Sequence, residues 1–207
     1  MTTSSSASAR ARIGVLASGS GSNLQALIDY FAGPGSDAGT IVWVGSNRAD
    51  AGALARAAAA GIPHGVIANP DDAESQLAQF RAADVDLLVL AGYLKLVPPG
   101  VVAAYHGRLL NIHPSLLPAF GGAGMHGMRV HEAVLAHGVK VSGATVHFVD
   151  NEFDRGAIAA QWPVRVHVND TPATLAARVL RAEHKLLPRT VAAVARGVIR
   201  LGREGGT

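Results

Sequence analysis

The chain has 207 residues, enough for one sizeable domain and too few for two ordinary domains joined by a linker. Hydrophobic residues make up 49%, charged residues 16% and aromatic residues 5%, so we expect a core of Ala, Val, Leu and Ile, as in a parallel sheet covered by helices on both faces. The net charge of +3 comes from scattered Lys and Arg, which argues against a nucleic-acid partner, and the absence of cysteine excludes disulfides, thiol nucleophiles and thiolate metal sites.

The two ends of the chain are expected to be tails. Residues 1–11 are predicted to be disordered, because residues 2–9 are small and polar and lack the apolar segment of a signal peptide. A single domain is expected over 12–200, followed by a flexible tail over 201–207. No apolar stretch approaches the ~20 residues that span a bilayer, so we expect a cytoplasmic protein with no membrane partner.

Short apolar runs alternate with helical patterns along the chain. Strands are predicted at 13–17, 41–44, 64–67, 87–90, 109–113, 141–149 and 157–166, and helices at 24–31, 51–60, 71–83, 99–105 and 127–136. The strand at 87–90 is wholly apolar and is therefore placed at the centre of the sheet. This order indicates an α/β fold, a doubly wound, mostly parallel, Rossmann-like sheet flanked by helices, with ligands outside the carboxyl ends of the strands.

The last predicted element is a long helix. It is expected to begin after Thr171, because Pro172 then stands near the first helical position. Apolar residues such as Leu175 and Val179 recur along one side and predict the buried face. Pro188 interrupts this stripe, and we expect a kink there.

A glycine-rich loop joins the first strand to the first helix. Its residues are Gly19, Ser20, Gly21, Ser22 and Asn23. Glycine lets the backbone turn and approach a ligand, and free N–H groups at a helix start can hold an anion. No Gly-Lys-Ser/Thr follows, and the second strand ends without the acid that grips a ribose diol. The loop therefore predicts a site for one phosphate and argues against a dinucleotide.

An amide and an imidazole stand two residues apart at the end of the strand at 109–113. Asn111 and His113 project from one face, while Ile112 projects from the other, and Pro114 ends the strand. An amide donor beside a histidine suits stabilisation of an oxyanion and movement of a proton. The same spacing also fits a buried polar pair that caps a loop.

The eight residues at 111–118, Asn-Ile-His-Pro-Ser-Leu-Leu-Pro, resemble the signature of the folate-dependent formyltransferases. The resemblance runs from about Arg12 to about Gly197, and it includes the segment at 90–93 and the run at 145–149 that leads to Asp154. It implies transfer of a formyl group from 10-formyltetrahydrofolate to the amine of glycinamide ribonucleotide in purine biosynthesis, by a monomer or homodimer. The histidines show no paired ligand spacing, so no metal is expected.

The resemblance also implies roles for individual residues. Asp154 is the catalytic acid that faces Asn111 and His113, a choice over Asp150 that spacing alone does not make. The glycine-rich loop holds the phosphate, Glu183 holds the ribose hydroxyls, and His147 is structural. The phosphate site is assigned to the N-terminal half of the domain, and folate binding and catalysis to the C-terminal half. The folate pocket is assigned to Leu90, Leu94, Lys95, Leu96, Val97, Leu109, Asn111, Val149 and Asp154.

Two departures from the family pattern stand out. Lys95 replaces an Arg found in some relatives, which affects contacts with the folate glutamate. The segment at 121–127 is longer and richer in Gly than its counterparts, which affects the lid over the substrate.

Four alternative functions stay open: formylation of another amine such as that of a nucleotide sugar, hydrolysis of formyltetrahydrofolate, a non-catalytic nucleotide-binding module, and a nicotinamide-dependent oxidoreductase. Formylation of methionyl-tRNA is not expected, because the chain leaves no room for a tRNA-binding domain.

Overall fold

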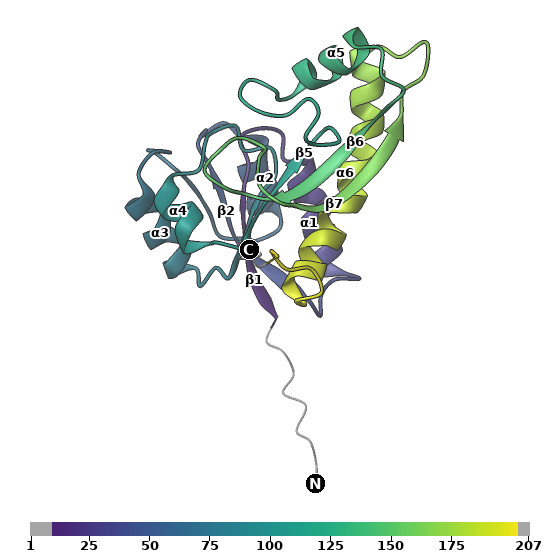
Figure 1. Ribbon diagram of the computed structural model, residues 1–207. Coiled ribbons are helices and arrows are strands. Elements are labelled where there is room, and N and C mark those ends of the chain that lie inside the picture. Colours follow the sequence, from purple (N-terminus) through teal and green to yellow (C-terminus); the bar gives the residue numbers. More distant parts are fainter. Residues whose placement is uncertain (1–9, 203–207) are drawn as a thin grey trace.

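Seven strands form one sheet in the computed structural model, which describes residues 10–202, and their order is β3-β2-β1-β4-β5-β6-β7 (Figure 1). The strands are β1 (Ala11–Leu16), β2 (Gly39–Ser46), β3 (His64–Val66), β4 (Leu87–Leu90), β5 (Leu109–His113), β6 (Val141–Phe148) and β7 (Ile158–Arg165). The helices are α1 (Ser22–Ala32), α2 (Gly52–Ala59), α3 (Ala73–Ala82), α4 (Pro99–Ala104), α5 (Met128–Ala136) and α6 (Pro172–Ala195).

The sheet is parallel from β3 to β5, and β6 and β7 are antiparallel additions at one side. The predicted α/β fold with a mostly parallel sheet is confirmed, and the apolar β4 lies at its centre as predicted. The chain winds outward from β1 to β3 and then returns to β4 on the other side of β1. The carboxyl ends of β1 and β4 therefore form the topological switch point, where open α/β sheets bind their ligands.

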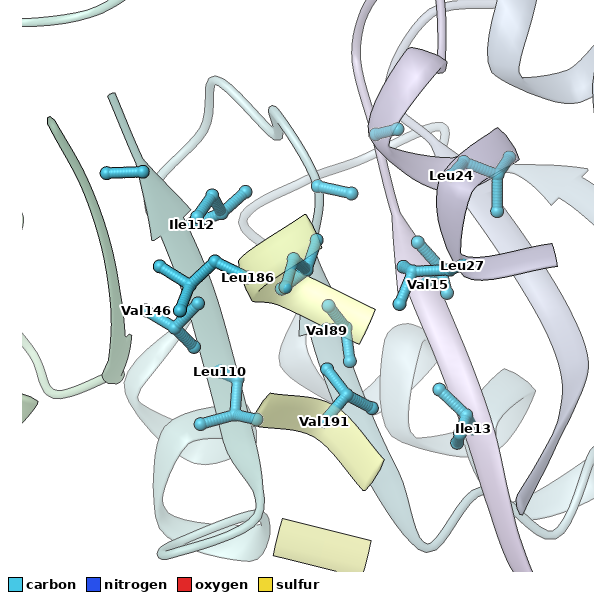
Figure 2. Packing of buried hydrophobic residues seen from close by; sticks show 14 of the residues in the cluster. Ile13, Val15, Leu24, Leu27, Val89, Leu110, Ile112, Val146, Leu186 and Val191 are labelled. Carbon is cyan, nitrogen blue, oxygen red and sulfur yellow. The ribbon is translucent and has the colours of Figure 1, made fainter. Parts of the chain in front are cut away.

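Helices cover both faces of the sheet. Buried residues of α3 and α4 pack on one face, and buried residues of α1, α2 and α6 pack on the other (Figure 1). Figure 2 shows the core of the second face, where aliphatic side chains from the central strands meet α1 and α6. Its labelled residues are Ile13, Val15, Leu24, Leu27, Val89, Leu110, Ile112, Val146, Leu186 and Val191.

Local capping sets the helix boundaries. Helix α3 begins at Ala73, slightly later than predicted, because the Asp72 carboxylate accepts a hydrogen bond from the Ser75 N–H and caps the first turn. Helix α6 begins at Pro172 after a capping box made by Thr171 and Thr174, and it continues through Pro188.

The predicted tails fall largely outside the described residues, which exclude 1–9 and 203–207. Ala11 belongs to β1 and not to a tail, and Leu201 packs against the core. Among residues 10–202, no helix combines the length and the apolar character needed to cross a bilayer.

Candidate active site

A cavity of about 570 Å³ opens at the carboxyl ends of the central strands. Its wall includes eight of the nine residues assigned to a folate pocket: Leu90, Leu94, Lys95, Leu96, Val97, Asn111, Val149 and Asp154. Residues from both halves of the chain form the wall. The division into a phosphate-binding half and a folate-binding half stays a prediction.

Leu109 was assigned to the same pocket, and the structure places it elsewhere. Its side chain is 1% exposed and packs beneath the cavity in the core next to α3 and α4. Leu109 is the first residue of β5, whereas Asn111 and His113 stand at the carboxyl end where the cavity opens. Residues of one strand face can therefore lie at different depths, and the alternation of side chains does not reveal which of them reach the ligand.

Asn111, His113 and Asp154 meet on the cavity wall. The His113 Nδ1 atom lies 3.3 Å from Asp154 Oδ2, and the Asn111 Nδ2 atom lies 3.4 Å from Asp154 Oδ1. Asp150 has a different position, since its carboxylate accepts a hydrogen bond from the Glu152 N–H within the turn. The geometry thus brings Asp154, and not Asp150, to the Asn–His pair.

The turn that carries Asp154 depends on its neighbours. Asp154 has a left-handed φ of 58°, and the Gly122 N–H donates to its Oδ2 at 2.9 Å. A Cβ atom on Gly156 would overlap the Phe148 carbonyl, so the Asp-x-Gly turn requires glycine at this point. The Asp154 carboxylate is therefore carried on a strained residue and held by the backbone N–H of Gly122.

Both ring nitrogens of His113 face acceptors. The Nε2 atom lies 2.8 Å from the Phe120 carbonyl, which can only accept, and Nδ1 faces Asp154. Burial nevertheless lowers the pKa of His113, and the Asp154 carboxylate and the Phe120 carbonyl oppose this shift without overcoming it. The Asp154 carboxylate thus favours the imidazolium form of His113, but burial outweighs this effect.

For the pKa of the Asp154 carboxyl, the effect of neighbouring groups outweighs the effect of burial. Burial alone would raise its pKa, but contacts with His147, His113 and the Gly122 N–H together hold the pKa below its ordinary value. Asp154 is therefore ionised at neutral pH.

His147 joins this cluster, which the sequence analysis did not predict. Its Nε2 atom lies 3.0 Å from Asn111 Nδ2 and 3.5 Å from Asp154 Oδ1. Its Nδ1 atom donates to the Phe148 carbonyl at 2.8 Å, so in the neutral ring Nε2 accepts from the Asn111 amide. His147 stands directly opposite Asn111 in the β5–β6 ladder. That register was the missing signal, because the sequence shows only that Thr145 and His147 share a strand face.

The glycine-rich loop lies beside the cavity, and of its five residues Asn23 alone belongs to the wall. The Gly19 carbonyl accepts from the Ala53 N–H at 3.1 Å, and the Ser20 carbonyl accepts from Arg56 Nε at 2.8 Å. Both carbonyls are thereby engaged by α2, whereas no backbone N–H at 19–24 donates to a carbonyl within residues 10–202. These N–H groups remain available for an anion at the start of α1.

Glu183 reaches the cavity from α6. Its Oε2 atom accepts a hydrogen bond of 2.6 Å from Asn23 Nδ2, and both residues belong to the wall. Burial raises the pKa of the Glu183 carboxyl, and the Asn23 hydrogen bond opposes that shift. The pair connects the glycine-rich loop with α6 at the cavity wall.

The segment at 121–127 covers another side of the cavity, to which Gly122, Gly124 and His126 contribute. Gly122 and Gly124 have φ values of 98° and 82°, which explains why this segment is rich in glycine. No group of three or more His, Asp or Glu side chains suited to a metal ion occurs in the part of the chain that the structure describes, and metal independence stays a prediction.

The chain is similar in sequence and in fold to known formyl transferases. The formyl transferase family model matches residues 11–191. The chain is 44% identical to the chloroplastic phosphoribosylglycinamide formyltransferase of Arabidopsis thaliana over 95% of its own length and 69% of that protein's. It is 43% identical to the trifunctional purine biosynthetic protein adenosine-3 of Bos taurus, of which it spans 19%.

Solved structures agree with these sequence matches. The crystal structure of phosphoribosylglycinamide formyltransferase from Anaplasma phagocytophilum superposes with a TM-score of 0.84 at 38% identity, covering 94% of this chain and 95% of that one. Since the family model spans most of the chain, the chain belongs to the formyl transferase family.

Proposed function

We propose that the protein transfers the formyl group of 10-formyltetrahydrofolate to the amine of glycinamide ribonucleotide, a step of purine biosynthesis. The observation that carries this proposal is the buried cluster of Asn111, His113 and Asp154 on the wall of a cavity beside the glycine-rich loop at 19–23. Because this loop offers free N–H groups, we call it the anion-binding loop. The similarity to phosphoribosylglycinamide formyltransferases supports it. We further propose a cytoplasmic monomer or homodimer.

The reaction needs no protein nucleophile. The substrate amine attacks the formyl carbon, a new C–N bond forms, and the formyl oxygen becomes an oxyanion. The tetrahedral intermediate collapses when the bond from this carbon to N10 of the folate breaks, and the proton lost by the amine ends on N10. The protein must therefore hold the two reactants together, stabilise the oxyanion and move one proton.

The cluster offers groups for the last two tasks, stabilising the oxyanion and moving the proton. The Asn111 amide is oriented by His147, and its long 3.4 Å contact with Asp154 leaves an N–H that a formyl oxygen can take over. Protonated His113, whose two N–H groups point to the Phe120 carbonyl and to Asp154, stabilises the oxyanion by its positive charge. The ionised Asp154 stabilises that charge and takes part in proton transfer.

Binding far from the reacting carbon fixes the amine. The N–H groups at 19–24 hold the phosphate, and Glu183 holds the ribose hydroxyls. The apolar wall made by Leu90, Leu96 and Val97 takes the pterin ring. Simple hydrolysis of the formyl folate would not need a phosphate site, so the available N–H groups favour an amine substrate that carries a phosphate.

The test is an assay of formyl-donor consumption with purified protein and 10-formyltetrahydrofolate. Glycinamide ribonucleotide, an amino nucleotide sugar and no amine form three parallel reactions. Consumption that depends on the ribonucleotide, with one formylated product per tetrahydrofolate released, supports the proposal. Equal consumption without any amine would identify a hydrolase, and dependence on the nucleotide sugar would identify a different transferase.

A further inference from the structure

Ser18 connects the ends of three strands at the switch point. Its hydroxyl accepts a hydrogen bond of 2.9 Å from the Leu94 N–H and donates one of 2.6 Å to Asn47 Oδ1. Its own N–H donates to the Gly92 carbonyl at 3.0 Å. The side chain is 2% exposed, so no water competes for these contacts.

The direction of these hydrogen bonds follows from the chemistry of the groups. A backbone N–H can only donate, so the hydroxyl proton of Ser18 must point to the Asn47 carbonyl. The hydroxyl then both donates and accepts a hydrogen bond, and the peptide unit before Leu94 is held in one orientation. Leu94 and Gly92 both belong to the cavity wall, and Ser18 itself directly precedes the anion-binding loop.

We propose that Ser18 is a positioning residue that ties the anion-binding loop at 19–23 to the folate-binding loop at 94–97. This inference rests on the proposed function. Its consequence is specific: although Ser18 belongs to the segment that leads into the phosphate site, its hydroxyl sets the geometry of the folate site. Loss of the hydroxyl takes away the acceptor of the Leu94 N–H and frees the folate loop to shift.

The position of Ser18 beside the anion-binding loop predicts that Ser18→Ala weakens binding of the ribonucleotide. Its hydrogen bond to the Leu94 N–H predicts instead that Ser18→Ala weakens binding of folate. We expect the KM for 10-formyltetrahydrofolate and the Kd for tetrahydrofolate to rise about tenfold, while the KM for the ribonucleotide changes less than about twofold. Kinetics with each substrate varied in turn gives the two KM values. Titration calorimetry with tetrahydrofolate, without ribonucleotide, gives the Kd independently of turnover.

Ser46→Ala is the matched control. Ser46 is also a buried serine at a strand end, but among residues 10–202 its hydroxyl accepts only from the Arg48 N–H in its own turn. We expect folate affinity like that of the wild type. Ser18→Cys, which keeps the volume and weakens both hydrogen bonds, replaces the alanine variant if that variant does not fold, and it should show the same selective loss of folate affinity.

Two results would overturn the inference: unchanged folate affinity in the Ser18 variants, or an equal loss in the Ser46 control. If the wild type binds tetrahydrofolate but does not formylate the ribonucleotide, the proposed function fails, while the calorimetric comparison still decides the role of Ser18. A wild type that does not bind tetrahydrofolate overturns both.

Discussion

The His113 Nδ1 atom lies 3.3 Å from Asp154 Oδ2, and both side chains are almost entirely buried. The other ring nitrogen is engaged by the Phe120 carbonyl. Phe120 and Asp154 both have a left-handed φ, 56° and 58°, which residues other than glycine rarely adopt. Two strained backbone positions thus present the two acceptors that fix the imidazole ring, an arrangement found at functional sites.

His113 and Asp154 are expected to act as a unit. His113→Ala and Asp154→Ala should each lower kcat nearly as much as the double variant, because either change removes the stabilised imidazolium. A double-mutant cycle on kcat measures the coupling. Additive losses would show that the two side chains act independently.

The pH profile tests the same pair. If the imidazolium is the active form, activity falls as pH rises through the pKa of His113. The Asp154 carboxylate raises that pKa against the effect of burial, so Asp154→Asn should move the alkaline limb of kcat/KM to lower pH. Profiles of both enzymes over a common pH range provide the measurement. An unshifted limb with full activity would mean that Asp154 serves only the turn before Gly156.

Asn111→Ala should lower turnover by about 10² to 10³ and leave folate binding nearly intact, because the lost N–H acts on the oxyanion and not on the ground state. Steady-state kinetics and a tetrahydrofolate titration measure the two effects. Asn169→Ala, at an exposed position before α6, is the control. Normal turnover of the Asn111 variant would remove this residue from the mechanism.

Gly21→Val should raise the KM for the ribonucleotide while the KM for folate stays the same. Gly21 has a φ of 75°, and a Cβ atom there would lie 2.7 Å from the Ala53 Cα, so the anion-binding loop must shift. Gly61→Val is the control for backbone strain, since Gly61 has a φ of 66° and open space around it. Both variants should lose about 1–2 kcal/mol of stability, but only the first should lose ribonucleotide affinity. An equal loss for both substrates would indicate general unfolding.

Glu183→Gln should make the protein more stable at neutral pH and bind the ribonucleotide less well. Burial raises the pKa of Glu183 above 4.5, so its contribution to stability is complete below that pH and declines as pH rises through the pKa of the folded state. Glutamine can still accept from Asn23, and it does not ionise.

The free energy of unfolding of each protein, measured from about pH 4 to about pH 8, should show the gap in favour of Glu183→Gln widening with pH. Exposed Glu132→Gln controls for the loss of a charge. A gap that is constant with pH would show that the pKa of Glu183 is the same in the folded and the unfolded protein.

Much of the architecture was predictable because it depends on local patterns. The apolar run of β4 predicted a central strand, and the spacing of Asn111 and His113 predicted that both project toward one side. Glycines at 19 and 21 between a strand and a helix predicted a loop whose N–H groups could hold an anion, and the structure shows that these N–H groups are available. Phosphate binding by the loop stays a prediction. These features follow from side-chain period and backbone freedom, which neighbouring residues determine.

Other features depend on residues far apart in the chain, and only the tertiary structure decided them. The antiparallel register of β5 and β6 brings His147 to Asn111, and the depth of the cavity separates Leu109 from the residues above it. Burial determines the direction of the His113 pKa shift, against the effect of its carboxylate partner. Strand spacing encodes which face a residue takes, but register, depth and desolvation arise only when distant segments pack together.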